Sequence, residues 1–132
     1  MLRATSSSDT TAFWSSTYRM KIKTVTFDDE INEPSGVVAS WDVGTIDNIT
    51  DVMAYIVNNE TSGYYDLYIQ SDGKLYANFD MSSWFADFGK LETVNGLELL
   101  DTTYMLYADS MFSGFAANSS SLNASITIKN SD

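Results

Sequence analysis

The sequence contains no cysteine, no histidine and only one proline among its 132 residues. Without cysteine there is no disulfide framework and no thiolate nucleophile, and without histidine there is no Ser-His-Asp relay. Zinc and copper sites also lose their usual thiolate and imidazole ligands. We therefore predict that the chain is not an enzyme and that it has no catalytic residue, no cofactor and no metal.

Basic residues are scarce as well: there are 7, against 18 acidic residues, which gives a net charge of −11. This charge disfavours binding to nucleic-acid phosphates and to anionic membranes. The longest apolar run covers only residues 52–57, far short of the roughly 18 residues that cross a membrane. No apolar segment of a secretory signal follows the first residues. We predict a soluble protein made in the cytoplasm, with no nucleic-acid partner and no membrane insertion.

Apolar and aromatic residues are abundant, at 44% and 14% of the chain, which is too many for a disordered protein. The length fits one domain. We predict a Ser/Thr-rich N-terminal arm at residues 1–17 and a single domain at residues 18–132. Phe13 and Trp14 interrupt the polar arm. This aromatic pair either packs back on its own domain or docks on a partner or a second copy.

Apolar and polar residues alternate along much of residues 18–79, which is typical of strands. In one such strand the apolar face consists of Val37, Ala39, Trp41 and Val43. The apolar parity changes between Ile22 and Val25, which predicts a bulge or burial on both faces. The Asp72-Gly73 pair lies between two β-rich segments and predicts a hairpin. The first part of the chain is thus predicted to form an antiparallel sheet of at least four strands.

The pattern changes after residue 79. Residues 80–89 fit a short helix that begins at the N-cap Asp80 and ends at Gly89. Leucine and valine positions follow, and the aromatic pattern returns 27 residues later, within the period of about 20–29 residues of leucine-rich repeats. The predicted fold class is therefore α+β and mainly β: the sheet of residues 18–79, then one and a half leucine-rich-repeat-like helix–strand units over about residues 80–128.

Several motifs in one order resemble BspA-like leucine-rich-repeat surface proteins. The run DTTYMLYADSMFSG at residues 101–114 resembles their Asp-Thr-Ser…Met-Ser-x-Met-Phe-x-Gly unit, and MSSWF at residues 81–85 looks like the preceding copy. The segments KIKTVTF, SWDV, MAYI and YDLYI, within residues 21–69, are similar to the leader before such repeats. The resemblance implies display on a surface. Because the sequence shows neither a secretion signal nor a wall anchor, a phage-encoded virion component is the expectation.

Contact with other proteins is expected because a repeat cannot bury its apolar face alone. Residues 116–132 are polar enough to cap the last unit; otherwise the last strand presents an open edge that pairs with another chain. We predict a homo-oligomer or an assembly with proteins of a host particle, with surface glycans as further candidate partners.

The residues predicted to bind a partner are basic or aromatic. They are Phe13, Trp14, Arg19, Lys21, Lys23, Tyr64, Tyr68 and Tyr76. The three basic residues form a strip on one face of a predicted strand, which either faces solvent or contacts acidic residues of a neighbouring copy. The three tyrosines share one face of the predicted hairpin and form an exposed aromatic patch. The many carboxylates are interpreted as a solvated acidic surface. A calcium site at residues 28–30, or at Asp47 and Asp51, is the alternative.

The first hypothesis for function is a non-enzymatic structural and interaction module on the surface of a phage virion, as a capsid decoration or a tail-associated protein that mediates assembly or attachment. A bacterial cell-surface adhesion module is one alternative. An acidic inhibitor that mimics nucleic acid and blocks a DNA-binding enzyme of the host is the other, because the net charge of −11 permits it.

Overall fold

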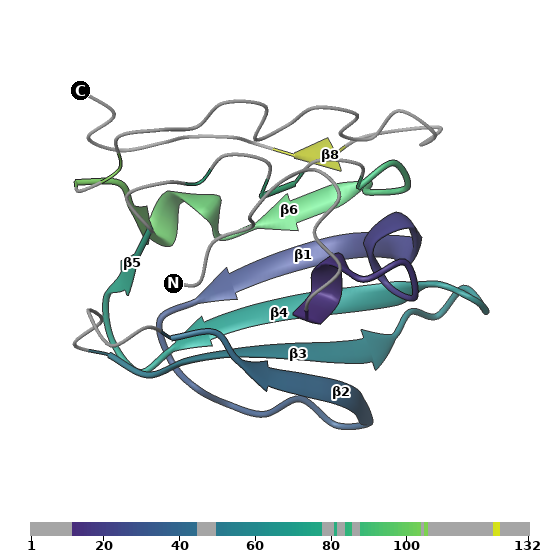
Figure 1. Cartoon of the computed structure of the whole chain (residues 1–132), viewed down its shortest axis with the longest axis horizontal. Coiled ribbons are helices and arrows are strands. Elements are labelled where there is room, and N and C mark those ends of the chain that lie inside the picture. The colour runs from purple at the N-terminus through teal and green to yellow at the C-terminus, as the bar shows by residue number, and fades with distance from the viewer. Residues whose placement is uncertain are drawn as a thin grey trace.

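The fold is built around one mixed sheet, which Figure 1 shows face-on. The structure is a computed structural model and describes residues 12–44, 50–77, 81, 84–85, 88–103, 105 and 123–124. In this part of the chain six strands lie side by side in the order β2–β3–β4–β1–β6–β8, and β5 and β7 pair separately. The elements are η1 (Ala12–Trp14), η2 (Arg19–Lys21), β1 (Ile22–Asp28), β2 (Val37–Asp42), β3 (Val52–Asn58), β4 (Tyr65–Ser71), β5 (Leu75–Tyr76), β6 (Thr93–Asn95), η3 (Leu97–Leu99), β7 (Leu100–Asp101) and β8 (Asn123–Ala124).

Strand direction divides the sheet into two parts. β2, β3 and β4 form an antiparallel ladder, so the predicted antiparallel sheet is confirmed for these three strands. β1 instead runs parallel to both of its neighbours, β4 and β6, and β6 runs parallel to β8. The prediction is therefore wrong for β1. The reason is topological: the chain leaves β1 and crosses to the far edge to form β2, and two antiparallel steps then return it to β1 in the same direction.

The turn at Asp72-Gly73 does not join a hairpin, contrary to the prediction. β4 ends at Ser71, and the next strand, β5, leaves the large sheet and pairs in parallel with β7. The Ser71 hydroxyl donates a hydrogen bond of 3.1 Å to the carbonyl of Lys74, which turns the chain away. The consecutive strands that do pair antiparallel are β2 with β3 and β3 with β4, the latter two joined through residues 59–64.

Two other strand predictions are confirmed. The register of β1 against β4 shifts between Ile22 and Thr24, which agrees with the first of the two predicted alternatives, a bulge or burial on both faces. Along β2 half-buried and exposed residues alternate in the predicted order. The half-buried ones are Val37, Ala39 and Trp41, and the exposed ones are Val38, Ser40 and Asp42.

The core lies against one face of the sheet and is rich in aromatic side chains. Those that are at most 2% exposed are Phe13, Trp14, Phe27, Trp84, Phe85 and Phe88. The Trp14 ring packs edge-on against that of Trp84, with 5.4 Å between centroids, and its Nε1–H donates a hydrogen bond of 2.9 Å to the Trp84 carbonyl. Residues 12–14 are therefore part of the core, so the described end of the predicted arm belongs to the domain.

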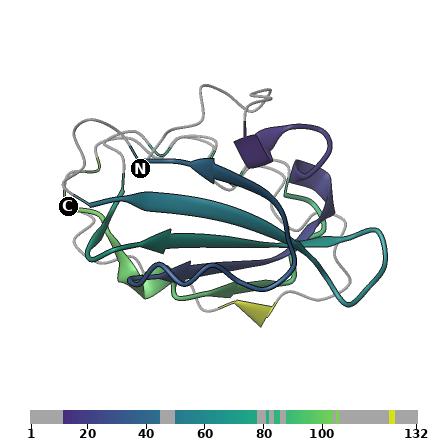
Figure 2. The same cartoon turned by 90° about the horizontal axis from the view of Figure 1, so that it is seen from below.

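The connection between β1 and β2 runs along the sheet on its other face (Figure 2). The side-chain amide of Gln70, on β4, accepts a hydrogen bond from the Asn32 N–H at 2.8 Å and donates one to the Asn32 carbonyl at 3.0 Å. Nearby on β3, Tyr55 is buried, and burial together with the negative charge of Glu33 raises the pKa of its phenol. The connection thus covers part of the outer face.

The predicted helix–strand repeat units are not shown. Where residues 80–89 are described, the chain forms turns: the N–H of Trp84 bonds to the carbonyl of Met81, and that of Phe88 to Phe85, each three residues back. Trp84, Phe85 and Phe88 are all buried, whereas residues 80, 82–83 and 86–87 of the predicted helix lie outside the described residues. The second predicted unit lies largely outside the described residues. Among these residues, no helix is long and apolar enough to cross a membrane.

Candidate functional site

The edge of the sheet formed by β2 is the candidate site for binding another protein. Among the described residues β2 pairs with β3 alone, and it stands at the bottom of Figure 1. The ladder continues to Val43, whose N–H donates to the Val52 carbonyl at 3.0 Å. Because such bonds recur at every second residue of an antiparallel strand, the N–H and C=O groups of Ser40 and Asp42 point away from β3. No other described strand pairs with these backbone groups, so an added strand can use them.

The side chains of β2 differ between its two faces. On the outer face, Val38 is 50% exposed, and Ser40 and Asp42 are exposed too. On the core face, Trp41 is half-buried; its ring packs on those of Phe13 and Tyr18 at 6.3 and 5.4 Å between centroids. The edge therefore presents part of the Trp41 ring on its core face, and a valine and a carboxylate on its outer face.

Natural edge strands often carry lysine, proline or a bulge that discourages pairing. β2 has neither lysine nor proline. Its register against β3 shifts between Val37 and Ala39, which leaves Val38 as an extra residue at the start of the strand. The regular part that remains, residues 39–42, is the part whose backbone can accept another strand.

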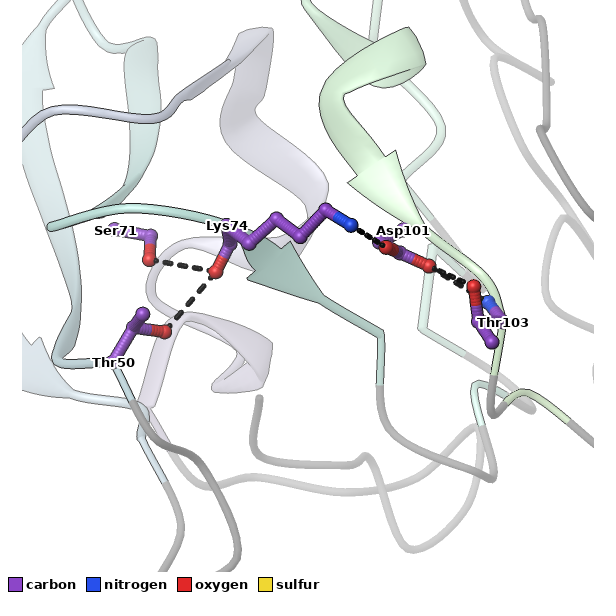
Figure 3. Close-up of polar contacts among 5 residues, drawn as sticks. All are labelled: Thr50, Ser71, Lys74, Asp101 and Thr103. Carbon is purple, nitrogen blue, oxygen red and sulfur yellow. Dashed lines mark hydrogen bonds and ion pairs between the residues drawn. The ribbon is translucent and has the colours of Figure 1, made fainter.

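A second feature is an open pocket of about 470 Å³ beside the small sheet of β5 and β7. Its charged lining residues are Asp29, Lys74, Glu98 and Asp101. Figure 3 shows that Lys74 reaches from the turn after β4 to Asp101 on β7, where the ammonium lies 3.2 Å from the carboxylate. The carbonyl of Lys74 accepts hydrogen bonds of 3.1 Å from the hydroxyls of Thr50 and Ser71.

These contacts have a structural role, and we call the linked residues Lys74, Asp101 and Thr103 the clasp. The N–H and hydroxyl of Thr103 both donate to Oδ1 of Asp101, the former at 2.9 Å. These hydrogen bonds, and to a smaller extent Lys74, hold the pKa of Asp101 below its usual value of 3.8. The ionised carboxylate thus ties the end of β7 to the turn that precedes β5. Because the Lys74 side chain is 67% exposed, the ion pair itself adds little.

The clasp makes the stability of the protein sensitive to acid. Since the folded-state pKa of Asp101 is lowered, the stability that it contributes is present above about pH 3.8 and is lost as the pH falls through the lowered value. We expect Asp101→Asn to reduce the free energy of unfolding by about 1 kcal/mol at pH 6. Urea denaturation from pH 6 down to pH 2 should show this difference shrinking. A difference that grows towards pH 2 would contradict the assignment.

The aromatic and basic residues predicted to bind a partner do not form one surface. Phe13 and Trp14 are 0% and 1% exposed, which corresponds to packing on their own domain and leaves them no surface for a partner. Arg19 and Lys21 lie in η2, not in a strand, and Arg19 is buried while Lys21 is exposed. Lys23 pairs with Glu92 at 3.5 Å. The predicted basic strip is therefore wrong, because Arg19 and Lys21 lie in η2, only Lys23 lies in a strand, and the exposure of the three residues differs.

The three tyrosines are also separated. Tyr64 lies just before β4 and Tyr68 lies within it, whereas Tyr76 lies in β5 of the small sheet. The three side chains therefore do not share the face of one hairpin. All three are half-buried. Lys23 lies over the Tyr64 ring at 4.8 Å and Lys74 over the Tyr76 ring at 5.8 Å, measured to the ring centroids. The predicted exposed aromatic patch is therefore wrong.

Metal binding is the remaining chemistry to test. Within the described ranges no three acidic side chains gather in a way that could hold a metal ion, and this includes residues 28–30. Asp47, of the other candidate calcium site, lies outside the described residues.

The sequence did reveal β2 as a strand with one apolar face. It carried no signal that this strand lies at the edge, because that depends on the order of strands in the sheet.

Comparison with known proteins does not assign the chain to a family. No family model matches the chain, and neither the curated proteins nor the solved structures compared with it give a match. The resemblance to BspA-like repeat proteins thus rests on the quoted motifs. Much of the run at residues 101–114 lies outside the described residues.

Proposed function

We propose that this protein is a non-enzymatic structural and interaction module on the surface of a phage virion, where it mediates assembly or attachment. The observation that carries the proposal is the edge of β2, a six-residue strand bonded on one side, among the described residues, and bearing a half-exposed valine. Such an edge is a template for strand addition. The motifs that resemble surface-displayed repeat proteins support a role in display.

The net charge of −11 also fits this proposal. Many negative charges keep a module that is displayed in many copies soluble and prevent unspecific association. The same charge is what an inhibitor that mimics nucleic acid would use, and an adhesion module on a bacterial surface would use the same open edge. These two alternatives are distinguished from the proposal by where the protein is found and how salt affects its binding.

The proposal predicts that the protein co-purifies with phage particles. Particles from a lysate of cells that carry the gene would be banded in a density gradient, washed in about 0.5 M NaCl and probed with an antibody against the chain. We expect the protein to remain in the particle band, because the backbone hydrogen bonds of an added strand persist when salt screens the charged contacts. An unrelated cytoplasmic protein of similar size and charge, expressed in the same cells, serves as the control.

Two outcomes would overturn the proposal in favour of an alternative. If the protein is found with the cell envelope and not with particles, the adhesion module is favoured. If it is found bound to a basic DNA-binding enzyme and is released by the salt wash, the inhibitor is favoured, since contacts that imitate phosphates weaken steeply with salt.

A further inference from the structure

We infer that the edge of β2, which no described strand other than β3 contacts as a pairing partner, binds a basic, extended segment of another protein. This segment pairs with residues 39–42 as an added strand. This inference rests on the proposed function as an interaction module and names the partner that the edge fits. The first argument is the backbone. Ser40 and Asp42 direct their N–H and C=O groups away from β3, so a strand placed beside β2 finds donors and acceptors in the ladder arrangement.

The side chains of β2 define the sequence of that segment. Because side chains alternate between faces, every second residue of an added strand lies beside Ala39 and Trp41, which are half-buried. Apolar residues there would complete the cover of the Trp41 ring. The intervening residues lie on the outer face beside Ser40 and Asp42, both exposed. A strand that alternates apolar and basic residues therefore fits both faces.

Charge favours a different protein over a second copy of this chain as the source of the strand. Glu33 precedes β2 and Asp42 ends it, and both are exposed. The chain has only 7 basic residues against 18 acidic ones, and Lys23 and Lys74 are already paired with Glu92 and Asp101. A second copy thus brings mainly negative charge to a negative edge. A lysine- or arginine-bearing segment brings the complement.

The test uses the whole chain and a synthetic peptide of alternating valine and lysine, with the valine–glutamate peptide of equal length as its counterpart. We expect calorimetry to show binding of the lysine peptide and none of the glutamate peptide. Hydrogen exchange of the Ser40 and Asp42 amides should slow only when the lysine peptide is present. Light scattering should show the chain alone to be a monomer.

Two variants locate the binding on β2. Ser40→Pro removes an outward N–H at an edge position where proline is tolerated, and should weaken peptide binding about tenfold or more. Asp42→Asn keeps the oxygen that accepts the Gly44 N–H at 2.9 Å but removes the charge, and should weaken binding about threefold. Glu60→Gln makes the same charge change on an exposed residue of the β3–β4 turn, and should leave binding unchanged. Circular dichroism checks that each variant is folded.

Several results would overturn the inference. Equal binding of both peptides, no binding at all, or an equal loss with Asp42→Asn and Glu60→Gln would each do so. A dimer that Ser40→Pro dissociates would make a second copy the occupant. Because the peptide test needs no particle, its failure with the protein still in the particle band rejects only this inference. Success of the test with the protein absent from particles rejects only the virion role.

Discussion

Gly96→Ala is expected to lower the free energy of unfolding by about 2–6 kcal/mol, from the cost of a left-handed backbone and that of overpacking together. Gly96 stands between β6 and η3 with a φ of +74°, which favours glycine. A Cβ atom there would lie 2.3 Å from the carbonyl oxygen of Phe27 and 3.2 Å from its carbonyl carbon. Since both are backbone atoms of β1, they cannot move aside as a flexible side chain does. Urea denaturation of both proteins measures the loss.

Gly36→Ala is the matched control for this prediction. Gly36 precedes β2 and has nearly the same φ, +73°, but a Cβ atom there would meet nothing within 4 Å. Gly36→Ala should therefore lower the free energy of unfolding by about 1 kcal/mol, the cost of the left-handed backbone alone. The difference between the two variants isolates the close approach of the chain at Gly96 to β1. Equal losses would show that the backbone of Phe27 does not lie against Gly96 as described.

The sequence predicted strands better than it predicted their neighbours. The alternation along β2 and the bulge at the start of β1 are local, because each follows from which side chains must face the core. The parallel pairing of β1 with β4 is not local. Nothing in the period-two pattern of β1 distinguishes a parallel from an antiparallel neighbour, and the crossing through residues 29–36 follows from the whole sheet.

The Asp72-Gly73 pair shows how a local signal is overruled. The two residues do form a turn, but the strand after it takes Leu75 to a parallel pairing with Leu100. Both leucines are buried, at 0% and 1% exposure. The strand after the turn thus pairs with a segment 25 residues further along the chain, and the sequence around the turn contains no information on Leu100.

The candidate site was missed for a related reason. The predicted partner residues were chosen as exposed basic or aromatic side chains, assuming that the strand already began at Arg19. In the structure η2 occupies Arg19–Lys21, so Arg19 is buried while Met20 is 51% exposed. The edge of β2 depends instead on backbone groups. Every residue carries these, so no residue type marks them.

Trp14→Ala is expected to reduce the free energy of unfolding by about 3–5 kcal/mol, the usual cost of removing a large buried aromatic. Trp14 is 1% exposed and packs on Phe13 at 4.5 Å and on Trp84 at 5.4 Å between ring centroids. Its loss also leaves the Trp84 carbonyl without the 2.9 Å hydrogen bond from Nε1, in a buried place where an unpaired acceptor is costly. Thermal and urea denaturation followed by circular dichroism would measure the effect.

Met20→Ala provides the control for Trp14→Ala, since Met20 is also a large apolar residue near the N-terminus but is 51% exposed. It should change stability by less than about 0.5 kcal/mol. If residues 12–14 were an arm loosely resting on the domain, both variants would be nearly neutral. A large loss for Trp14→Ala alone would mean that this segment closes the core, where Phe13 and Trp14 are out of reach of a partner.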